Sequence, residues 1–135
     1  MEFMKWDASY SVKVKACDDD HKKLFSMINT LHDAMKAGHG ADRVGGIVRE
    51  LGSYAKYHFA REEAFMEKAK YPDLPGHRAE HQAFIRRVEQ FHKDLAAGQG
   101  GQSVAVADFL NKWLTGHIRQ IDQKYSSHLN SHGIE

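Results

Sequence analysis

The sequence contains little cysteine, little proline and no long apolar run among its 135 residues. Its single cysteine, Cys17, cannot close an internal disulfide, and alone it cannot supply the paired thiolates of a sulfur-based zinc site. Any metal in this chain must therefore be held by nitrogen and oxygen. Residues 1–10 carry charges and lack an apolar stretch long enough for a signal peptide or a membrane span. We therefore expect a cytoplasmic protein with no membrane partner.

Charge of neither sign is in excess. The sequence has 19 Lys and Arg residues and 18 Asp and Glu residues, which gives a formal net charge of +1. No run of basic residues stands out that could neutralise several phosphates, so no nucleic-acid partner is expected. At this length, one compact domain over residues 1–135 is expected.

Proline and glycine are concentrated in a few places, and these divide the chain into four segments. Pro72 and Pro75 share one short segment, and glycines cluster at 38–46 and 98–101. Between these breaks apolar residues recur at three- and four-residue steps, which predicts helices at about 19–37, 42–69, 74–97 and 103–130. Because the connections are short, the predicted fold is all-α, an antiparallel up-down-up-down four-helix bundle.

The residues before the first helix have their own prediction. Asp18 to Asp20 offer side-chain oxygens of the kind that cap a helix amino terminus. Residues 1–17 are predicted to form an N-terminal arm on the bundle, in which Trp6 and Tyr10 pack against the helices.

Histidine is abundant, with ten residues, and imidazole is the commonest side-chain metal ligand. In an antiparallel bundle, the starts of the first and third helices lie at the same end as the ends of the second and fourth. Five histidines and two carboxylates of the apolar stripes fall at this level. These seven predicted metal ligands are His21, His58, Glu62, His77, His81, His117 and Asp122.

The spacing of these ligands suits a site with two metal ions. The pairs on the second and third helices are four residues apart, so both members of each pair lie on one helix face. His117 and Asp122 are five apart, which on a regular helix turns the second side chain roughly 140° from the first. We expect a carboxylate that bridges sideways or a locally widened turn. Seven ligands exceed one tetrahedral zinc and fit two six-coordinate ions bridged by Glu62 and Asp122.

Four stretches form one ordered pattern over nearly the whole chain. They are Asp18 with H-K-K-L-F from His21, H-F-A-R-E-E-A-F-M from His58, Y-P-D-L-P-G-H-R-A-E-H-Q-A-F from Tyr71, and W-L-T-G-H-I-R-Q-I-D from Trp113. This pattern resembles the hemerythrin family, specifically its single-domain bacterial members. The chain departs from the family before His21, where V-K-V-K-A-C-D-D-D replaces the more usual glycine and isoleucine. Asp20 stands at a position that the family often gives to Gln.

The resemblance implies a non-haem di-iron centre that binds dioxygen reversibly. One iron would be held by His77, His81 and His117 and the other by His21 and His58, with Glu62, Asp122 and an oxo or hydroxo group as bridges. The uneven division leaves one coordination site open for dioxygen as the ions change between Fe2+ and Fe3+. Candidates for an apolar oxygen pocket that excludes water are Leu24, Phe25, Phe59, Met66, Trp113, Leu114 and Ile118. Tyr125 would hydrogen-bond to the site or pack beside it.

The implied role is oxygen binding rather than enzymatic catalysis. Carriage, storage, delivery to an oxygen-using enzyme and sensing through a signalling partner all need the same site. Redox chemistry on peroxide or nitric oxide is an alternative with the same metals.

Two other classes of protein compete with this interpretation. H-R-A-E-H at 77–81 matches the H-x-x-E-H motif of inverted zinc metalloproteases, with Glu80 as the base. That motif leaves the ligands on the other three helices unexplained. A ferritin-like di-iron oxidase would carry two Glu-x-x-His repeats, whereas a single match, Glu89 to His92, occurs here and lies away from the other ligands.

The remaining histidines are not predicted ligands. His32 and His92 each follow a ligand by eleven residues, roughly 16 Å along a helix, and are predicted to be hydrogen-bonded residues at the end of the core. His39 lies in a glycine-rich turn and is predicted to be exposed. His128 and His132 lie near a fraying terminus and are not expected to bind metal.

Overall fold

The computed structural model describes residues 4–98 and 102–135, which form helices and turns with no strand among them. The elements are η1 (Ala8–Tyr10), α1 (Lys15–Lys36), α2 (Gly40–Lys68), α3 (Leu74–Ala96), α4 (Gln102–Gly116), the π-helical η2 (His117–Ile121), the 3-10 helix η3 (Asp122–Tyr125) and α5 (Ser126–Ser131). From α4 to α5 the helical segments follow one another without a break. The fourth rod of the bundle therefore changes its helix type part of the way along.

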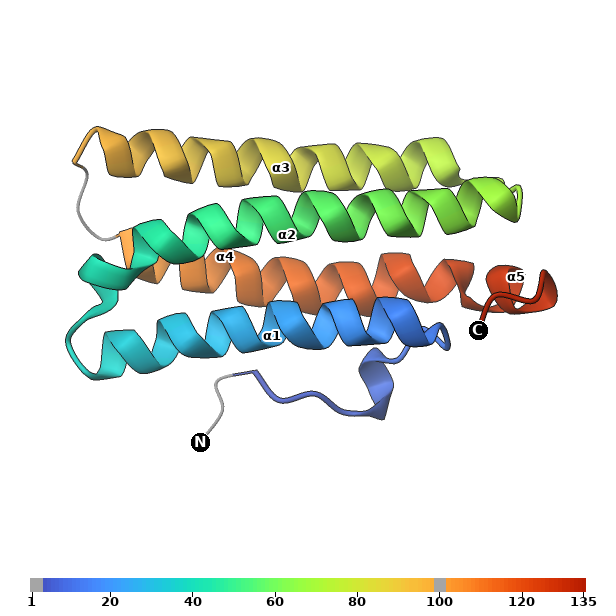
Figure 1. The fold of residues 1–135 in the computed structure, drawn as a ribbon, viewed down its shortest axis with the longest axis horizontal. Coiled ribbons are helices and arrows are strands. Elements are labelled where there is room, and N and C mark those ends of the chain that lie inside the picture. Colours follow the sequence, from blue (N-terminus) through green and yellow to red (C-terminus); the bar gives the residue numbers. More distant parts are fainter. Residues whose placement is uncertain (1–3, 99–101) are drawn as a thin grey trace.

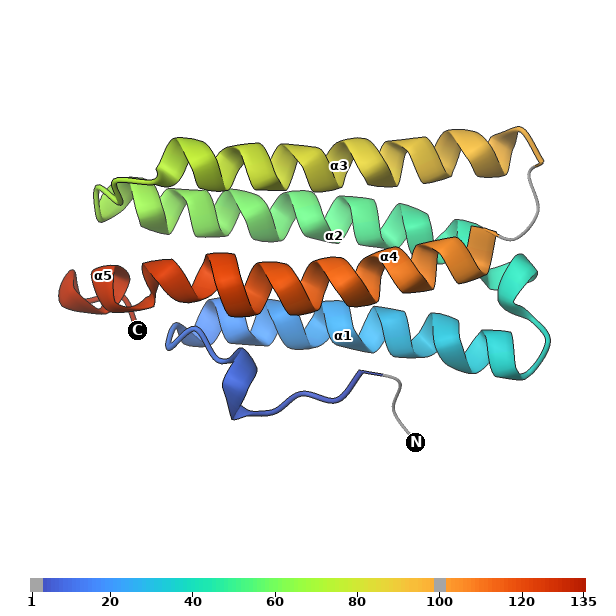
Figure 2. The same ribbon diagram turned by 180° about the vertical axis from the view of Figure 1, so that it is seen from behind.

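Neighbouring helices run in opposite directions, which confirms the predicted four-helix bundle (Figures 1 and 2). α1 contacts α2 and α4, and α2 also contacts α3. We call one end of the bundle the site end (residues 15–25, 55–78 and 113–129) and the opposite end the far end (31–51, 84–98 and 102–110). Among the described residues, no helix combines the length and the apolar character needed to cross a bilayer.

The core follows the three- and four-residue spacing of apolar side chains. On α1, Leu24, Ile28 and Leu31 are fully buried, and on the fourth rod Val106 and Leu110 are buried in the same way. A stripe of this kind places one face of each helix against its neighbours, and removing that apolar area from water is the main force that closes the bundle.

The start of α1 differs from the prediction. The helix begins at Lys15, its N-cap is Val14, and no side chain caps it. The predicted capping role of Asp18 to Asp20 is therefore wrong. The carboxylate of Asp18 instead accepts hydrogen bonds from the backbone N–H of Val12 at 2.8 Å and the hydroxyl of Ser11 at 2.7 Å. Asp18 thus closes the turn that leads into a helix already under way.

The N-terminal arm is shorter than the predicted 1–17, because α1 begins at Lys15, and residues 1–3 lie outside the described chain. Its aromatic residues pack on the bundle. The ring of Tyr10 lies 4.8 Å from the ring of Phe25 on α1, and the guanidinium of Arg119 in η2 covers Tyr10 at 4.1 Å. The side-chain amide of Gln123 in η3 donates to the carbonyl oxygen of Ser11 at 2.7 Å. The arm is therefore attached to both α1 and the irregular segment of the fourth rod (Figure 1).

The turns at the two ends of the bundle use different residues where the backbone is left-handed. At the far end, Gly38 follows α1 with φ +81° and Gly98 follows α3 with φ +76°. At the site end, Gly133 takes this conformation after α5 with φ +80°, and so do two lysines, Lys13 with φ 60° and Lys70 with φ 55°. Because a side chain disfavours positive φ, the turns of the site end are the more strained ones.

Candidate metal centre

Five histidines and two carboxylates are buried side by side at the site end of the bundle. They come from the start of α1, the later part of α2, the start of α3 and the irregular segment of the fourth rod, and none is more than 5 % exposed. The structure brings together all seven residues that were predicted from spacing: His21, His58, Glu62, His77, His81, His117 and Asp122. For brevity we call His21 and His58 the two-histidine group, and His77, His81 and His117 the three-histidine group.

Glu62 lies between the two histidine groups. Its Oε2 is 3.3 Å from Nε2 of His21 and 3.2 Å from Nε2 of His58. Its other oxygen, Oε1, is 3.1 Å from Nε2 of His81. The two oxygens of this carboxylate therefore face different groups of imidazoles.

Asp122 divides its oxygens in the same way. Its Oδ2 is 3.2 Å from Nε2 of His21, while its Oδ1 is 2.9 Å from Nε2 of His77 and 2.8 Å from Nε2 of His117. Carboxylates that present one oxygen to each of two donor groups have the arrangement needed to bridge two cations.

A widened turn places Asp122 in this position. Residues His117 to Ile121 form a π-helical turn, and the backbone N–H of Asp122 bonds to the carbonyl oxygen of His117, five residues earlier. The extra residue in the turn brings Asp122 back toward the face that carries His117. Of the two arrangements that the i,i+5 spacing left open, the structure has the widened turn.

The electrostatics of the cluster couple the carboxylates to the imidazoles. Burial alone would raise the pKa of Glu62, but His58, His21 and His77 outweigh it and hold that pKa well below its usual value. Burial would lower the pKa of His21, yet contact with Asp122 and Glu62 raises it to about 10. Without a metal the cluster thus keeps anionic carboxylates beside protonated imidazoles, and a cation would take the place of those protons.

The donor atoms of the cluster are arranged to bind a metal ion rather than to form hydrogen bonds with one another. Nε2 of His77, His81 and His117, Oε1 of Glu62 and both oxygens of Asp122 are buried and make no hydrogen bond within the described part of the chain. Several of these atoms lie about as close as hydrogen-bonded atoms do, but their angles are unsuitable. Buried polar atoms normally find partners, so orphaned nitrogens and oxygens that point into one volume indicate a cation site of imidazole and carboxylate donors.

Two of the imidazoles form a hydrogen bond through Nδ1, the ring nitrogen that does not face the cluster. The carboxylates that accept these bonds were not predicted as site residues. Nδ1 of His58 donates to Oδ2 of Asp20 at 2.8 Å, and Nδ1 of His81 donates to Oε2 of Glu63 at 2.9 Å. Both contacts cross between helices, so spacing along one helix gives no signal for them. A search for acidic residues next to predicted ligands would have found both, since Asp20 precedes His21 and Glu63 follows Glu62.

Tyr125 makes the hydrogen bond that the sequence left as one of two options. Its hydroxyl donates to Oε2 of Glu62 at 2.6 Å in the fully buried interior. Burial and the nearby carboxylates raise its pKa well above the usual value, which keeps the phenol protonated as a donor. Tyr125 thereby orients the carboxylate that lies between the two histidine groups.

Aromatic rings cover the three-histidine group. Phe59 stacks on the imidazole of His81 with ring centroids 3.8 Å apart, and Trp113 stacks on His117 at 4.1 Å. Phe84, which was not among the predicted pocket residues, packs against Trp113 at 4.3 Å. The other predicted pocket residues are buried in the core, namely Leu24, Phe25, Met66, Leu114 and Ile118. Among them, Phe25 packs against the N-terminal arm.

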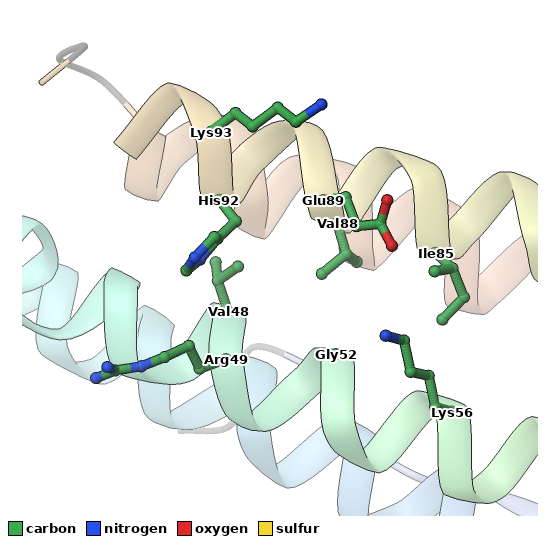
Figure 3. A pocket seen from close by; sticks show the side chains of 9 residues that line it. All are labelled: Val48, Arg49, Gly52, Lys56, Ile85, Val88, Glu89, His92 and Lys93. Carbon is green, nitrogen blue, oxygen red and sulfur yellow. The ribbon is translucent and has the colours of Figure 1, made fainter. Parts of the chain in front are cut away.

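The residues that are specific to the competing motifs, Glu80, Glu89 and His92, are not part of the cluster in the described chain. Glu80 of the H-x-x-E-H motif is not among the carboxylates that gather with His77 and His81 in the described chain. Glu89 and His92 line a shallow surface groove between α2 and α3, over Val88 (Figure 3). His92 is exposed, so its predicted place as a hydrogen-bonded histidine at the end of the core is wrong, because its side chain points into the groove rather than into the core.

The remaining histidines and Cys17 are not part of the metal cluster in the described chain. His39 is exposed, as predicted, and His32 is half-buried. Nε2 of His128 donates to the carbonyl oxygen of Ala69 at 2.6 Å, which ties α5 to the end of α2. Cys17 is buried, and burial together with the Glu62 carboxylate raises its pKa, so the thiol stays protonated. A protonated thiol is not a metal ligand.

Fold and site together define a class of protein: a four-helix bundle with a buried cluster of histidines and carboxylates, able to hold metal, at one end of its core. Residues 12–129 match the family model described as the hemerythrin HHE cation binding domain. The chain therefore belongs to the hemerythrin family, which confirms the resemblance seen in the sequence motifs.

Individual relatives and solved structures agree with this membership. The chain is 33 % identical to a bacteriohemerythrin of Stenotrophomonas maltophilia over 98 % of its own length and 85 % of the relative's. It is 32 % identical to a bacteriohemerythrin of Methylococcus capsulatus over 97 % of its own length and the full length of the relative. A crystal structure of wild-type hemerythrin superposes with a TM-score of 0.83 and 32 % identity, covering 94 % of this chain and 98 % of that one.

Proposed function

We propose that this chain binds dioxygen reversibly at a non-haem di-iron centre at the site end of the bundle. One observation carries the proposal: Glu62 and Asp122 each present one oxygen to the two-histidine group and the other to the three-histidine group. A single metal ion would not need two divided carboxylates. Membership of the hemerythrin family supports iron as the metal.

In this proposal each group of imidazoles holds one iron. The two-histidine group would hold one ion and the three-histidine group the second, and the two ions would share Glu62 and Asp122 as ligands. The two-histidine group would offer one protein ligand fewer than the three-histidine group, which would leave room for dioxygen on its side. The bound iron pair supplies the electrons for reversible binding of dioxygen.

The protein's own residues orient the donors and keep the site dry. The hydroxyl of Tyr125 fixes one oxygen of Glu62, and the Phe59 and Trp113 rings stack on two of the imidazoles. The seven ligands are 5 % exposed or less, so water reaches them poorly. A dry, histidine-rich site favours binding of oxygen over catalysis with it, which is why we propose an oxygen-binding protein rather than an enzyme.

The visible spectrum of the iron-loaded protein tests this function. The anaerobically reduced protein is colourless in the proposal, gains an oxo-to-iron charge-transfer band in air, and loses the band when oxygen is removed. Repeated cycles without loss of amplitude are expected. If the band persists after oxygen is removed, so that only a chemical reductant restores the starting spectrum, carriage is wrong and redox chemistry on peroxide or nitric oxide takes its place.

A further inference from the structure

We infer that Asp20 is a positioning residue which fixes the imidazole of His58 and favours the oxidised state of the iron that His58 would hold. The inference rests on the proposed di-iron function and adds a residue that regulates it. Asp20 lies on α1, directly before the predicted ligand His21, but its side chain acts on a ligand of α2.

The carboxylate of Asp20 is buried and fully partnered. The residue is 4 % exposed. Its Oδ2 accepts from Nδ1 of His58 at 2.8 Å and lies 3.4 Å from Nε of Arg61. Its Oδ1 accepts from the hydroxyl of Tyr54 at 2.9 Å. A buried carboxylate with three partners remains ionised and stays in one position.

This contact determines which nitrogen of His58 is free for metal. When Nδ1 carries the proton that Asp20 accepts, the lone pair is on Nε2. Nε2 is the atom that lies 3.2 Å from Oε2 of Glu62, inside the cluster. Asp20 therefore selects the tautomer that the site needs and makes the imidazole a stronger electron donor.

The effect is concentrated on the two-histidine side. Nδ1 of His21, the second member of that group, is buried with no hydrogen-bond partner among the described residues. Asp20 therefore provides the group's single carboxylate contact at an Nδ1 atom in the described chain. On the other side Glu63 holds His81, but the side chain of Glu63 is 25 % exposed against 6 % for Asp20. Solvent screens an exposed charge more than a buried one. The negative charge of Asp20 thus stabilises ferric over ferrous iron at the two-histidine position.

The test measures ferrous iron retention and reduction potential in Asp20→Asn. This variant keeps the shape of the side chain and removes its charge. We expect ferrous affinity to fall about 10- to 100-fold, the usual effect of losing a partner that orients a metal ligand. If ferric iron is weakened about tenfold more than ferrous iron, the potential rises by about 59 mV. Asp19→Asn is the matched control, because Asp19 is exposed and pairs with Lys15, and neither quantity should change.

A second variant shifts the potential in the opposite direction. Tyr54→Phe removes one hydrogen bond from the Asp20 carboxylate, which concentrates its charge on His58 and should lower the potential while iron is retained. Tyr54 is half-buried, so this variant keeps the proposal open to test even if Asp20→Asn folds poorly. Unchanged potentials in Tyr54→Phe and in a folded Asp20→Asn would overturn the inference. Wild-type protein that binds no iron would instead overturn the proposed function.

Discussion

The far end of the bundle buries Val44, Leu51, Phe91 and Leu110 among other apolar side chains. The site end buries Asp20 and the seven predicted ligands at similar depth. Apolar burial stabilises the far end without further partners. Buried carboxylates and imidazoles cost free energy unless they are paired or bound to metal. The same four helices therefore carry both stability and function, and the two are separated along the bundle axis.

The turns repeat this contrast. Far-end turns place glycine in the left-handed conformation, at Gly38 and Gly98, whereas the site end places Lys13 and Lys70 there as well as Gly133. Strain at the functional end and relaxed geometry at the opposite end is the usual division in proteins. Variants at the two ends should therefore affect different measurable properties.

Removing Glu62 should produce the largest difference in iron content between variants of the two ends. Glu62→Ala takes away the carboxylate that faces both histidine groups, so neither iron keeps its shared ligand, and we expect iron to be lost from the purified protein. His92→Ala, at the groove of the far end, should retain iron at the wild-type level. Metal analysis of both proteins measures this, and equal iron loss in the two would show that the site does not lie at the end we assign.

A core variant at the far end should lower the free energy of unfolding and leave the iron content unchanged. Leu110 is fully buried, and Leu110→Ala leaves a cavity that typically lowers the free energy of unfolding by about 2–5 kcal/mol. Because the ligands lie at the other end, the iron content per folded chain should stay unchanged. Denaturant unfolding and metal analysis on the same sample give both values, and loss of iron from a still-folded variant would contradict the separation of the two ends.

Metal affinity should depend on pH because imidazoles at the site end must lose protons to bind metal. In the metal-free protein, contacts with Asp122 and Glu62 raise the pKa of His21 to about 10 and that of His77 to about 9 in spite of burial. Both imidazoles are then protonated at pH 7 and must lose the proton to bind metal. Metal affinity should rise about tenfold per pH unit for each proton released, up to about pH 9.

Proton release measures this directly. Adding ferrous iron anaerobically to the metal-free protein in a weakly buffered indicator should acidify the solution at pH 7. His92→Ala should release as many protons as the wild type, because His92 takes no part. A metal affinity that does not change between pH 7 and 9 would show that the imidazoles are already neutral in the free cluster.

The strained turn before α1 should give the smallest effect. Lys13→Gly relieves a positive φ that costs roughly 1–2 kcal/mol for a residue with a side chain, and the greater freedom of glycine in the unfolded chain offsets about 0.5–1 kcal/mol of that gain. The free energy of unfolding should therefore rise by about 0.5 kcal/mol. Lys68→Gly, in the last turn of α2, should instead destabilise by about 1 kcal/mol. Thermal melts that rank the two variants in the opposite order would show that the backbone at Lys13 is not strained.

Much of the fold and the cluster could be predicted because both depend on local periodicity. Apolar residues at three- and four-residue steps predicted the helices, and an antiparallel arrangement then brought seven distant residues to one level. The i,i+5 spacing of His117 and Asp122 predicted either a carboxylate that bridges sideways or a widened turn, since a regular helix would send the two side chains in different directions. These features need no knowledge of how one helix faces another.

What could not be predicted depends on contacts between elements. Asp18 reads as a helix cap in the sequence, but its carboxylate binds the arm, whose path the sequence does not define. Asp20 and Glu63 hold imidazoles on neighbouring helices, and the rotation of each helix about its axis decides those pairs. His92 follows the ligand His81 at helical spacing, yet its side chain points into the surface groove between α2 and α3 (Figure 3), a contact between elements that spacing along one helix does not define.

Mössbauer spectroscopy of the oxidised, iron-loaded protein at liquid-helium temperature tests the central claim most directly, because it reports whether two ions share bridging ligands. The account predicts about two irons per chain and a spectrum of quadrupole doublets without magnetic splitting in weak field, since the spins of two bridged ferric ions cancel. A magnetically split spectrum from one isolated ferric ion per chain would contradict the claim that Glu62 and Asp122 bridge two metals.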